Sequence, residues 1–132
     1  MTVEQAIHQC WASSATLAAL VPAERVSTGR SIGAAVPYVT LLRERTRTAL
    51  RTNAGNTIEE ITLRINLWHD DHDAGRAAAE QIRAAFDHAS FDLADGSRVI
   101  SMRRVSESAF QHADGLWQFS LRFLLPVRLA CD

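Results

Sequence analysis

The sequence predicts an α+β fold: a mainly antiparallel sheet with a long β-hairpin, and two helices packed on one face of the sheet. Apolar residues recur at three- and four-residue steps near the N-terminus and again after residue 73, as on one side of a helix. Between and after these stretches, apolar and polar residues alternate, as in half-buried strands. Clusters of turn residues separate the alternating stretches, so consecutive strands are joined by hairpins and run antiparallel.

Length, composition and charge fit a single globular domain spanning residues 1–132. The chain is 47% hydrophobic and 22% charged, which is ordinary for such a domain. Its net charge of −1 creates no overall field that would attract DNA or an acidic membrane. All 14 basic residues are arginines, whose planar side chains favour fixed, bidentate contacts. Cys10 and Cys131 belong to no CxxC pair, so we expect free thiols in a reducing compartment.

The first helix is expected over residues 3–21. Thr2 and Gln5 match a capping box, and Pro22 ends the helical pattern. The stripe that should face the sheet consists of Val3, Ile7, Cys10, Trp11, Ser14, Leu17, Ala18 and Val21. No basic segment precedes this stripe, so a signal peptide is not expected. No apolar run approaches the roughly 20 residues that a membrane span requires, so we expect no membrane association.

Strands are expected next. A short strand at residues 25–27 precedes a glycine-containing loop at residues 28–35, and Pro37 then stands at the entry of a longer strand. That strand leads into a long β-hairpin whose turn is expected at residues 53–56, Asn-Ala-Gly-Asn. On the returning strand, polar residues alternate with a set that should face the core: Ile61, Leu63, Ile65 and Leu67.

A second helix is expected from Asp71 or Asp73 to His88. Its predicted buried stripe is Ala74, Ala78, Ile82, Ala85, Phe86 and Ala89. Asp95 and Gly96 are a strong hairpin signal, and a strand is expected after them at residues 97–107.

The last strand is expected at residues 116–129, after a turn at residues 111–115. Pro126 predicts that the end of this strand leaves the ladder or lies at a sheet edge. One face of the strand should carry Trp117, Phe119, Leu121, Phe123 and Leu125. From their positions on these stripes, five aromatic residues are expected to share one core: Trp11, Phe86, Trp117, Phe119 and Phe123.

Two histidines and three aspartates occupy the consecutive positions His69–Asp73, and these residue types can bind metals or transfer protons. Consecutive residues in an extended chain point to opposite faces, so they do not converge on one ion. The spacings of HExxH and calcium-loop motifs are absent. Aspartates before a helix instead cap its free N–H groups and suit its dipole. We therefore predict a polar joint between strand and helix, with no catalysis, metal or cofactor.

Arg43, Arg45 and Arg47 alternate along the outgoing strand of the hairpin, which predicts that they share one face. Arg51 continues that face only approximately. Two interpretations fit this arginine row. It is either a solvated face partly neutralised by Glu59 and Glu60 on the return strand, or a contact surface for an acidic partner subunit or a nucleic-acid backbone. No aromatic residues interleave with the arginines, which argues against a platform for single-stranded nucleic acid.

Four segments, taken in order, form a recognisable pattern. They are a helix ending in LAALVPAERVSTG, the proline-led strand AAVPYVTLL, the strand, acidic joint and alanine-rich helix of ITLRINLWHDDHDAGRAAAEQIRAAF, and the late strand GLWQFSLRFLLPVRL. This pattern resembles the tailed-phage tail-completion proteins, a family of small tail-terminator and head–tail joining proteins of phages, prophages and gene-transfer agents. The resemblance spans about residues 3–129 and includes no catalytic signature.

The resemblance implies a structural virion protein that forms a homo-oligomeric ring, commonly a hexamer, on the end of a tail tube. The expected partners are the major tail tube protein and head–tail connector proteins, with nucleic acid present only as DNA passing through the ring. The implied location is the host cytoplasm during assembly and then the virion tail.

We expect the hairpin to supply the subunit interface, through Arg43, Arg45, Arg47, Arg51, Glu59 and Glu60. Two alternatives remain open at this point. One is a head-side connector adaptor, and the other is a small metal-dependent enzyme that uses the polar cluster His69–Asp73.

Overall fold

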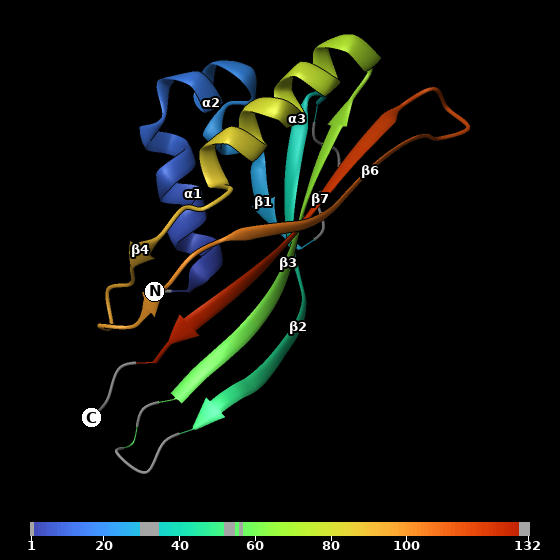
Figure 1. Cartoon of the computed structure of the whole chain (residues 1–132). Helices are drawn as coiled ribbons and strands as arrows, with labels where there is room; N and C mark the ends of the chain where they lie inside the picture. The colour runs from blue at the N-terminus through green and yellow to red at the C-terminus, as the bar shows by residue number, and fades with distance from the viewer. Residues whose placement is uncertain (1, 30–34, 52–54, 56, 130–132) are drawn as a thin grey trace.

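Within the described residues, seven strands form one sheet, and the α-helices cover one of its faces (Figure 1). The computed structural model describes residues 2–29, 35–51, 55 and 57–129. The strand order is β1-β2-β3-β7-β5-β4, and β6 also pairs with β7. Every pairing is antiparallel except that of β1 with β2. The predicted α+β fold with a mainly antiparallel sheet is therefore confirmed.

The elements have the following bounds. The helices are α1 Val3–Ser13, α2 Ala15–Leu20 and α3 His72–Phe86, with a 3₁₀ turn, η1, at Ala23–Arg25. The strands are β1 Val26–Thr28, β2 Tyr38–Arg51, β3 Thr57–His69, β4 Phe91–Asp92, β5 Arg98–Val99, β6 Arg103–Gln111 and β7 Trp117–Arg128.

The N-terminal helical segment is two helices, where the sequence predicted one. The capping box is confirmed, because the Gln5 backbone N–H donates to Thr2 Oγ1 over 3.2 Å and the Thr2 N–H donates to Gln5 Oε1 over 2.9 Å. At Ser14 the backbone becomes extended, and Ser14 Oγ accepts a hydrogen bond from the Leu17 N–H. A serine hydroxyl that bonds nearby backbone groups competes with the helical ladder. Ser14 therefore ends α1 and caps α2.

The long hairpin consists of β2 and β3, which pair from Tyr38 and Trp68 to Arg51 and Thr57. The predicted turn at residues 53–56 lies outside the described residues except for Gly55, whose φ of +85° suits a glycine. The predicted inward set on β3 is confirmed as buried: Ile61, Leu63, Ile65 and Leu67.

Helix α3 begins after Asp71 and packs on the sheet through its smallest residues. Part of the predicted stripe was wrong, because Ala74 and Ala85 are exposed while Gly75 and Ala79 are buried. A β-carbon added at Gly75 would overlap the ring of Phe119. The glycine therefore lets the start of the helix approach Phe119 of β7 closely.

The C-terminal half differs from expectation at two places. The strand predicted at residues 97–107 is interrupted, because β5 ends at Val99 and β6 starts at Arg103. Pro126 was expected at a strand end or edge, but it lies inside β7 opposite Glu60. Its carbonyl accepts a hydrogen bond from the Ile100 N–H, on the side of β7 where the partner changes from β6 to β5. Proline has no backbone N–H, and an N–H at this position would point to the same side as the carbonyl, away from β3. The proline therefore removes no hydrogen bond between β7 and β3.

The core lies between the helices and the inner face of the sheet. Four of the five aromatic residues predicted to meet there are buried, namely Trp11, Phe86, Phe119 and Phe123. The fifth, Trp117, is partly buried and packs against the same cluster. The rings of Trp11 and Phe86 stack with their centroids 6.1 Å apart, which joins α1 to α3. The prediction of a shared core is confirmed.

Candidate interaction surface

The outer half of β2 is an exposed sheet edge. Among the described residues, β1 pairs only with Val39–Leu41, and no strand lies beside residues 42–51 on that side. Every residue from 42 to 51 is exposed. In Figure 1 the lower ends of β2 and β3 extend below the helices. A strand edge of this kind presents unpaired N–H and C=O groups that another chain can bind.

The predicted arginine row does not occupy one face. A β-bulge falls between Arg43 and Arg45, so Arg43 lies opposite Leu63 on the helix side, whereas Arg45 lies opposite Thr62 on the open side. Arg47 follows Arg45 on the open side, opposite Glu60. A bulge inserts one extra residue and so shifts the alternation of all residues beyond it. The prediction of a shared face was wrong because the sequence pattern assumed unbroken alternation.

Arg43 is instead part of the fold. Its Nε donates to Glu4 Oε1 over 2.7 Å and its Nη2 donates to Glu4 Oε2 over 2.9 Å. Glu4 is only 7% exposed, so its carboxylate is largely shielded from water. Burial raises the pKa of Glu4, but the hydrogen bonds and the charge of Arg43 outweigh this effect and hold the pKa below its ordinary value. This bidentate ion pair fixes α1 to the root of the hairpin.

The open face of the sheet is partly neutralised. Glu44 forms ion pairs with Arg122 and Arg64, with N–O distances of 2.7 Å and 3.0 Å. Arg47 forms an ion pair with Glu60 at an N–O distance of 2.8 Å. The expected neutralisation of the hairpin by a return-strand glutamate is therefore confirmed at Glu60. Glu59 lies opposite Thr48, on the other face. Two cations of the hairpin, Arg45 and Arg51, make no ion pair within the described part of the chain.

Aromatic rings form a row across the other end of the open face. Tyr38 stacks on Trp68 with centroids 5.8 Å apart, Trp68 stacks on His112 at 5.2 Å, and His112 contacts Phe110 at 5.0 Å. Beside this row, the Gln118 amide donates to the side-chain oxygen of Asn66 over 3.1 Å. These side chains pack against one another on the face of the sheet that the α-helices leave uncovered.

The polar cluster His69–Asp73 is a joint, as predicted. The Asp71 carboxylate accepts a hydrogen bond from the Asp73 N–H over 3.3 Å and is the N-cap of α3. His69 Nδ1 accepts from the Asp71 N–H over 3.0 Å. Nowhere among the described residues do three or more His, Cys, Asp or Glu side chains meet in a way that could hold a metal ion.

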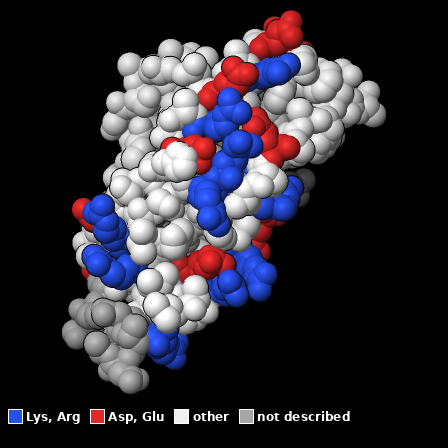
Figure 2. Space-filling view, in the orientation of Figure 1, with Lys and Arg blue, Asp and Glu red and all other residues white. Residues whose placement is uncertain are grey.

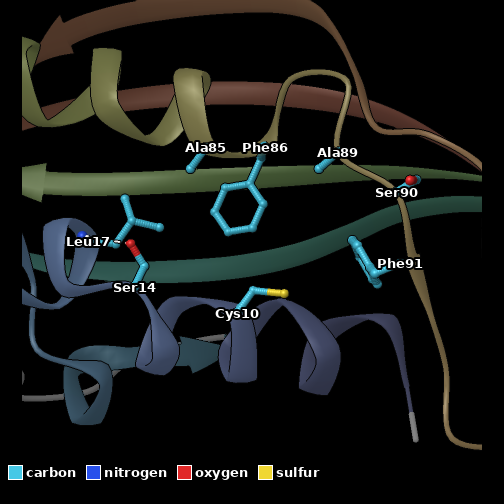
Figure 3. A pocket seen from close by; sticks show the side chains of 8 residues that line it. All are labelled: Cys10, Ser14, Leu17, Ala85, Phe86, Ala89, Ser90 and Phe91. Atoms are coloured by element: carbon cyan, nitrogen blue, oxygen red, sulfur yellow. Dashed lines mark hydrogen bonds between the residues drawn. The ribbon is translucent and has the colours of Figure 1, made fainter.

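One apolar pocket of about 300 Å³ lies between the N-terminal helices and the end of α3 (Figure 3). Leu17, Phe86 and Phe91 are among its apolar lining residues, and Cys10 and Ser14 line it from α1 and from the end of α1. Cys10 is a free, exposed cysteine, and Cys131 lies outside the described residues. No histidine or carboxylate is among the residues that line the pocket, so neither the thiol nor the hydroxyl has a general base there.

Charges of both signs are interleaved on the face shown in Figure 2, with no broad area of one sign. Acidic and basic residues also pair between α3 and β6, because Glu107 is 3.7 Å from Arg83 and 3.4 Å from Arg104. Such a surface differs from the single-sign stripe expected of a nucleic-acid binding face. None of the described helices combines the length and the apolar character that crossing a membrane would require.

Comparison with known proteins identifies the family. A family model described as tail completion protein gp17 matches residues 5–127. A chain in a solved structure titled "Virion of native gene transfer agent (GTA) particle" shares the fold, with a TM-score of 0.78 and 21% identity over 96% of this chain and 95% of that chain. A search of curated proteins found no match. Because the family match spans nearly the entire chain and the predicted resemblance points to the same group, the chain belongs to the tail completion protein gp17 family.

Proposed function

We propose that this tail completion protein closes the end of a tail tube as an oligomeric ring and joins that end to the head connector. Membership in the family gives the protein a structural role in a phage-type tail. The observation that carries the finer proposal is the exposed ribbon of β2 and β3, whose outer edge is unpaired within the described residues. A two-stranded ribbon is marginal by itself in water, so a neighbouring subunit would supply the missing burial.

The proposed ring follows from the kind of contact that such a ribbon makes. A ribbon that binds a different surface on the next copy makes a heterologous contact, and heterologous contacts close into a ring when the rotation between copies permits it. We propose six copies. The contact is weak between two free copies, so the protein closes into a ring on the tube end, where the tube holds several copies together.

The cations available to this interface are fewer than the sequence predicted. Arg43 forms an ion pair with Glu4 and so connects the hairpin to α1 within the same chain. We therefore leave it out of the proposed contact. Arg45, Arg47 and Arg51 remain, with Glu59 and Glu60 on the returning strand. These charges would meet complementary groups on a neighbouring subunit or the tube protein, where they set orientation and association rate more than affinity.

The proposal includes a location and a set of partners. The protein acts in the host cytoplasm during assembly and then in the virion tail. Its partners are further copies of itself, the major tail tube protein and the head–tail connector proteins. DNA passes through the ring without sequence-specific contact, which agrees with the net charge of −1 and the interleaved surface charges. No catalytic step is proposed.

A tube-elongation assay tests this function. Purified tube protein is polymerised with and without the full chain, and tube lengths are measured by electron microscopy. Wild-type protein should arrest growth and bind one end of the tube. A variant with Arg45→Glu and Arg47→Glu should fold normally by circular dichroism but cap poorly, whereas the control Arg76→Glu on α3 should cap normally. Wild-type protein that leaves tube length unchanged, or binds along the tube wall, would contradict the proposal.

A further inference from the structure

Exposed apolar side chains are concentrated on two edges of the sheet. The described part of the chain has five large exposed hydrophobic residues, and four of them lie on β2 or β6: Leu42, Leu50, Val105 and Phe110. Strand β6 pairs with β7 on one side, and no described strand lies on its other side. Besides the short terminal strands β1 and β4, the described sheet therefore has two long exposed edges, residues 42–51 of β2 and residues 103–111 of β6.

We propose that the free edge of β6 in one copy pairs with the free edge of β2 in the next copy, so that one sheet continues through neighbouring subunits. This inference rests on the ring proposed above and names its second surface. The occupant of the β6 edge is thus a second copy of this chain. The contact is heterologous, because two different edges meet, and it leaves each copy with one edge of each kind for its two neighbours.

Strand direction allows this junction to repeat. Strand β2 is antiparallel to β3, β3 is antiparallel to β7, and β7 is antiparallel to β6. Strands β2 and β6 therefore run in opposite directions within one copy. When two copies lie side by side with their corresponding strands pointing in the same direction, β2 of one copy is antiparallel to β6 of the other. The two strands can then form an antiparallel ladder. Neighbouring strands are then antiparallel across the junction, as β2, β3, β7 and β6 are within each copy.

Charge disfavours the competing arrangement in which two copies pair through the same edge. On the β2 edge, Arg43 and Arg47 are paired with Glu4 and Glu60, and Arg45 and Arg51 make no ion pair within the described part of the chain. Two β2 edges side by side would bring like charges together, which destabilises cross-strand pairs. In contrast, the two arginines of the β6 edge, Arg103 and Arg104, precede its bulge, and the segment 105–111 beyond it contains no basic residue. Its one charged residue is Glu107, which already lies near Arg83 and Arg104. The β6 edge is thus the better partner for an arginine-rich β2 edge.

Backbone geometry supplies the matching donors and acceptors. A residue in an antiparallel strand directs its N–H and C=O to the same side, and the side alternates along the strand. On β6, the His112 N–H donates across the hairpin to the Leu116 carbonyl. By alternation, three β6 residues direct their backbone groups outward, away from β7: Glu107, Ala109 and Gln111.

The same argument applies to β2. The Leu41 carbonyl accepts from the Gly29 N–H on the outer side of β2, and Leu41 lies opposite Ile65. Thr46 lies opposite Ile61 and Thr48 lies opposite Glu59. Ile61 and Glu59 are an even number of residues from Ile65, so their backbone N–H and C=O groups point to the same side of β3 as those of Ile65. Thr46 and Thr48 therefore also direct their N–H and C=O groups outward.

Both edges carry features that shorten the contact and make it specific. Bulges near Glu44 and Ala49 leave residues 45–48 of β2 as regular strand. On β6 a bulge lies between Arg104 and Ser106, and the Asp87 carboxylate already accepts the Arg104 N–H over 3.1 Å. Bulges, charges and covered N–H groups prevent indiscriminate edge pairing. What remains is a short strand on each side, suited to a contact that forms when copies are already gathered on a tube.

Cross-linking on assembled tubes tests the pairing. The full chain, with Cys10→Ser and Cys131→Ser, receives Thr46→Cys and Ala109→Cys. These positions lie on the same side of the sheet, because Thr46 is opposite Ile61 and Ala109 is opposite Phe119, both buried under the helices. A bifunctional thiol reagent spanning about 8 Å tolerates a register difference of two residues. The expected product is a ladder of covalent oligomers that ends at the ring number.

The controls separate this inference from the ring itself. Each single-cysteine variant should stay monomeric on a denaturing gel, and an efficient dimer from Thr46→Cys alone would show that β2 edges pair with each other and overturn the proposal. Rings seen at tube ends without any ladder from the double variant would also overturn it, while the proposed function would stand. Absence of rings at tube ends would contradict both.

A second variant probes the backbone directly. Ala109→Pro removes an outward N–H of β6 without removing a hydrogen bond to β7. If the variant keeps the wild-type circular dichroism spectrum, it should need at least tenfold more protein to cap the same number of tubes. A folded Ala109→Pro variant that caps tubes like the wild type would overturn the proposal. The cross-linking result decides the question if the proline variant does not fold.

Discussion

Replacing Arg43 by alanine should destabilise the fold, although Arg43 lies on the exposed part of β2, two residues before Arg45, which makes no ion pair within the described residues. Its guanidinium group makes two hydrogen bonds to Glu4, which is 7% exposed. Without Arg43, that carboxylate remains buried with no cation to balance it. The charge must then be hydrated by opening the contact between α1 and the hairpin, or it must be neutralised by a proton.

The expected loss of unfolding free energy is about 2 kcal/mol. Removing one partner of a fully buried ion pair costs about 3–5 kcal/mol. The Arg43 side chain is 36% exposed, so water replaces part of the lost interaction and lowers this figure. Arg45 is the matched control, because it follows two residues later and makes no described ion pair. Arg45→Ala should change stability by less than about 0.5 kcal/mol.

Chemical denaturation followed by tryptophan fluorescence measures both losses. The pH dependence supplies a second readout. Because the folded-state pKa of Glu4 is lowered, the stabilisation by the pair is complete above the unfolded pKa near 4.5 and is lost as pH falls through the lower folded pKa. The difference between wild type and Arg43→Ala should therefore shrink in acid. Equal losses for the Arg43 and Arg45 variants at neutral pH would refute the bulge and the assigned role of Glu4.

Three further substitutions test the packing and the polar joint. Phe86→Ala should lose about 3–5 kcal/mol, because the ring is 2% exposed and stacks on Trp11; a loss below about 1 kcal/mol in thermal or chemical unfolding would contradict its core position. Gly75→Ala would gain about 1 kcal/mol in an ordinary helix, but overlap with Phe119 should reverse the sign and cost about 1–3 kcal/mol by the same measurement; a stabilised variant would count against the close approach. Asp71→Ala should lose about 1 kcal/mol through its N-cap while Asp71→Asn stays near wild type, and a chelator that lowers the melting temperature of either protein would reveal a metal role instead.

Much of the fold could be predicted because local chemistry determines it. Alternation on β3 and β7, the capping box at Thr2 and the aspartate cap at Asp71 each depend on neighbours in sequence. The break at Ser14 could have been anticipated, since serine favours helix starts over helix interiors. The polar joint was predictable for the same reason, because consecutive side chains cannot converge.

The arginine row shows where local pattern fails. Arg43 and Arg45 satisfy an alternating pattern in sequence, but the alternation holds only while the strand stays regular. The bulge at Glu44 is stabilised from a distance, by Arg64 and Arg122 on other strands and by Glu4 on α1. No window around the hairpin contains these partners. The free edge of β6 was equally hidden, because it depends on which strands pair along the entire sheet.

Cryo-electron microscopy of tails carrying this chain is the most direct test of the central claim, which is that the protein is a ring that closes the tube end. The reconstruction should contain a closed ring of copies at one end of each tube, at the junction with the head connector, with the sheet of each copy matching the fold described above. Copies spread along the tube, or a tail whose ends lack this chain, would contradict the account.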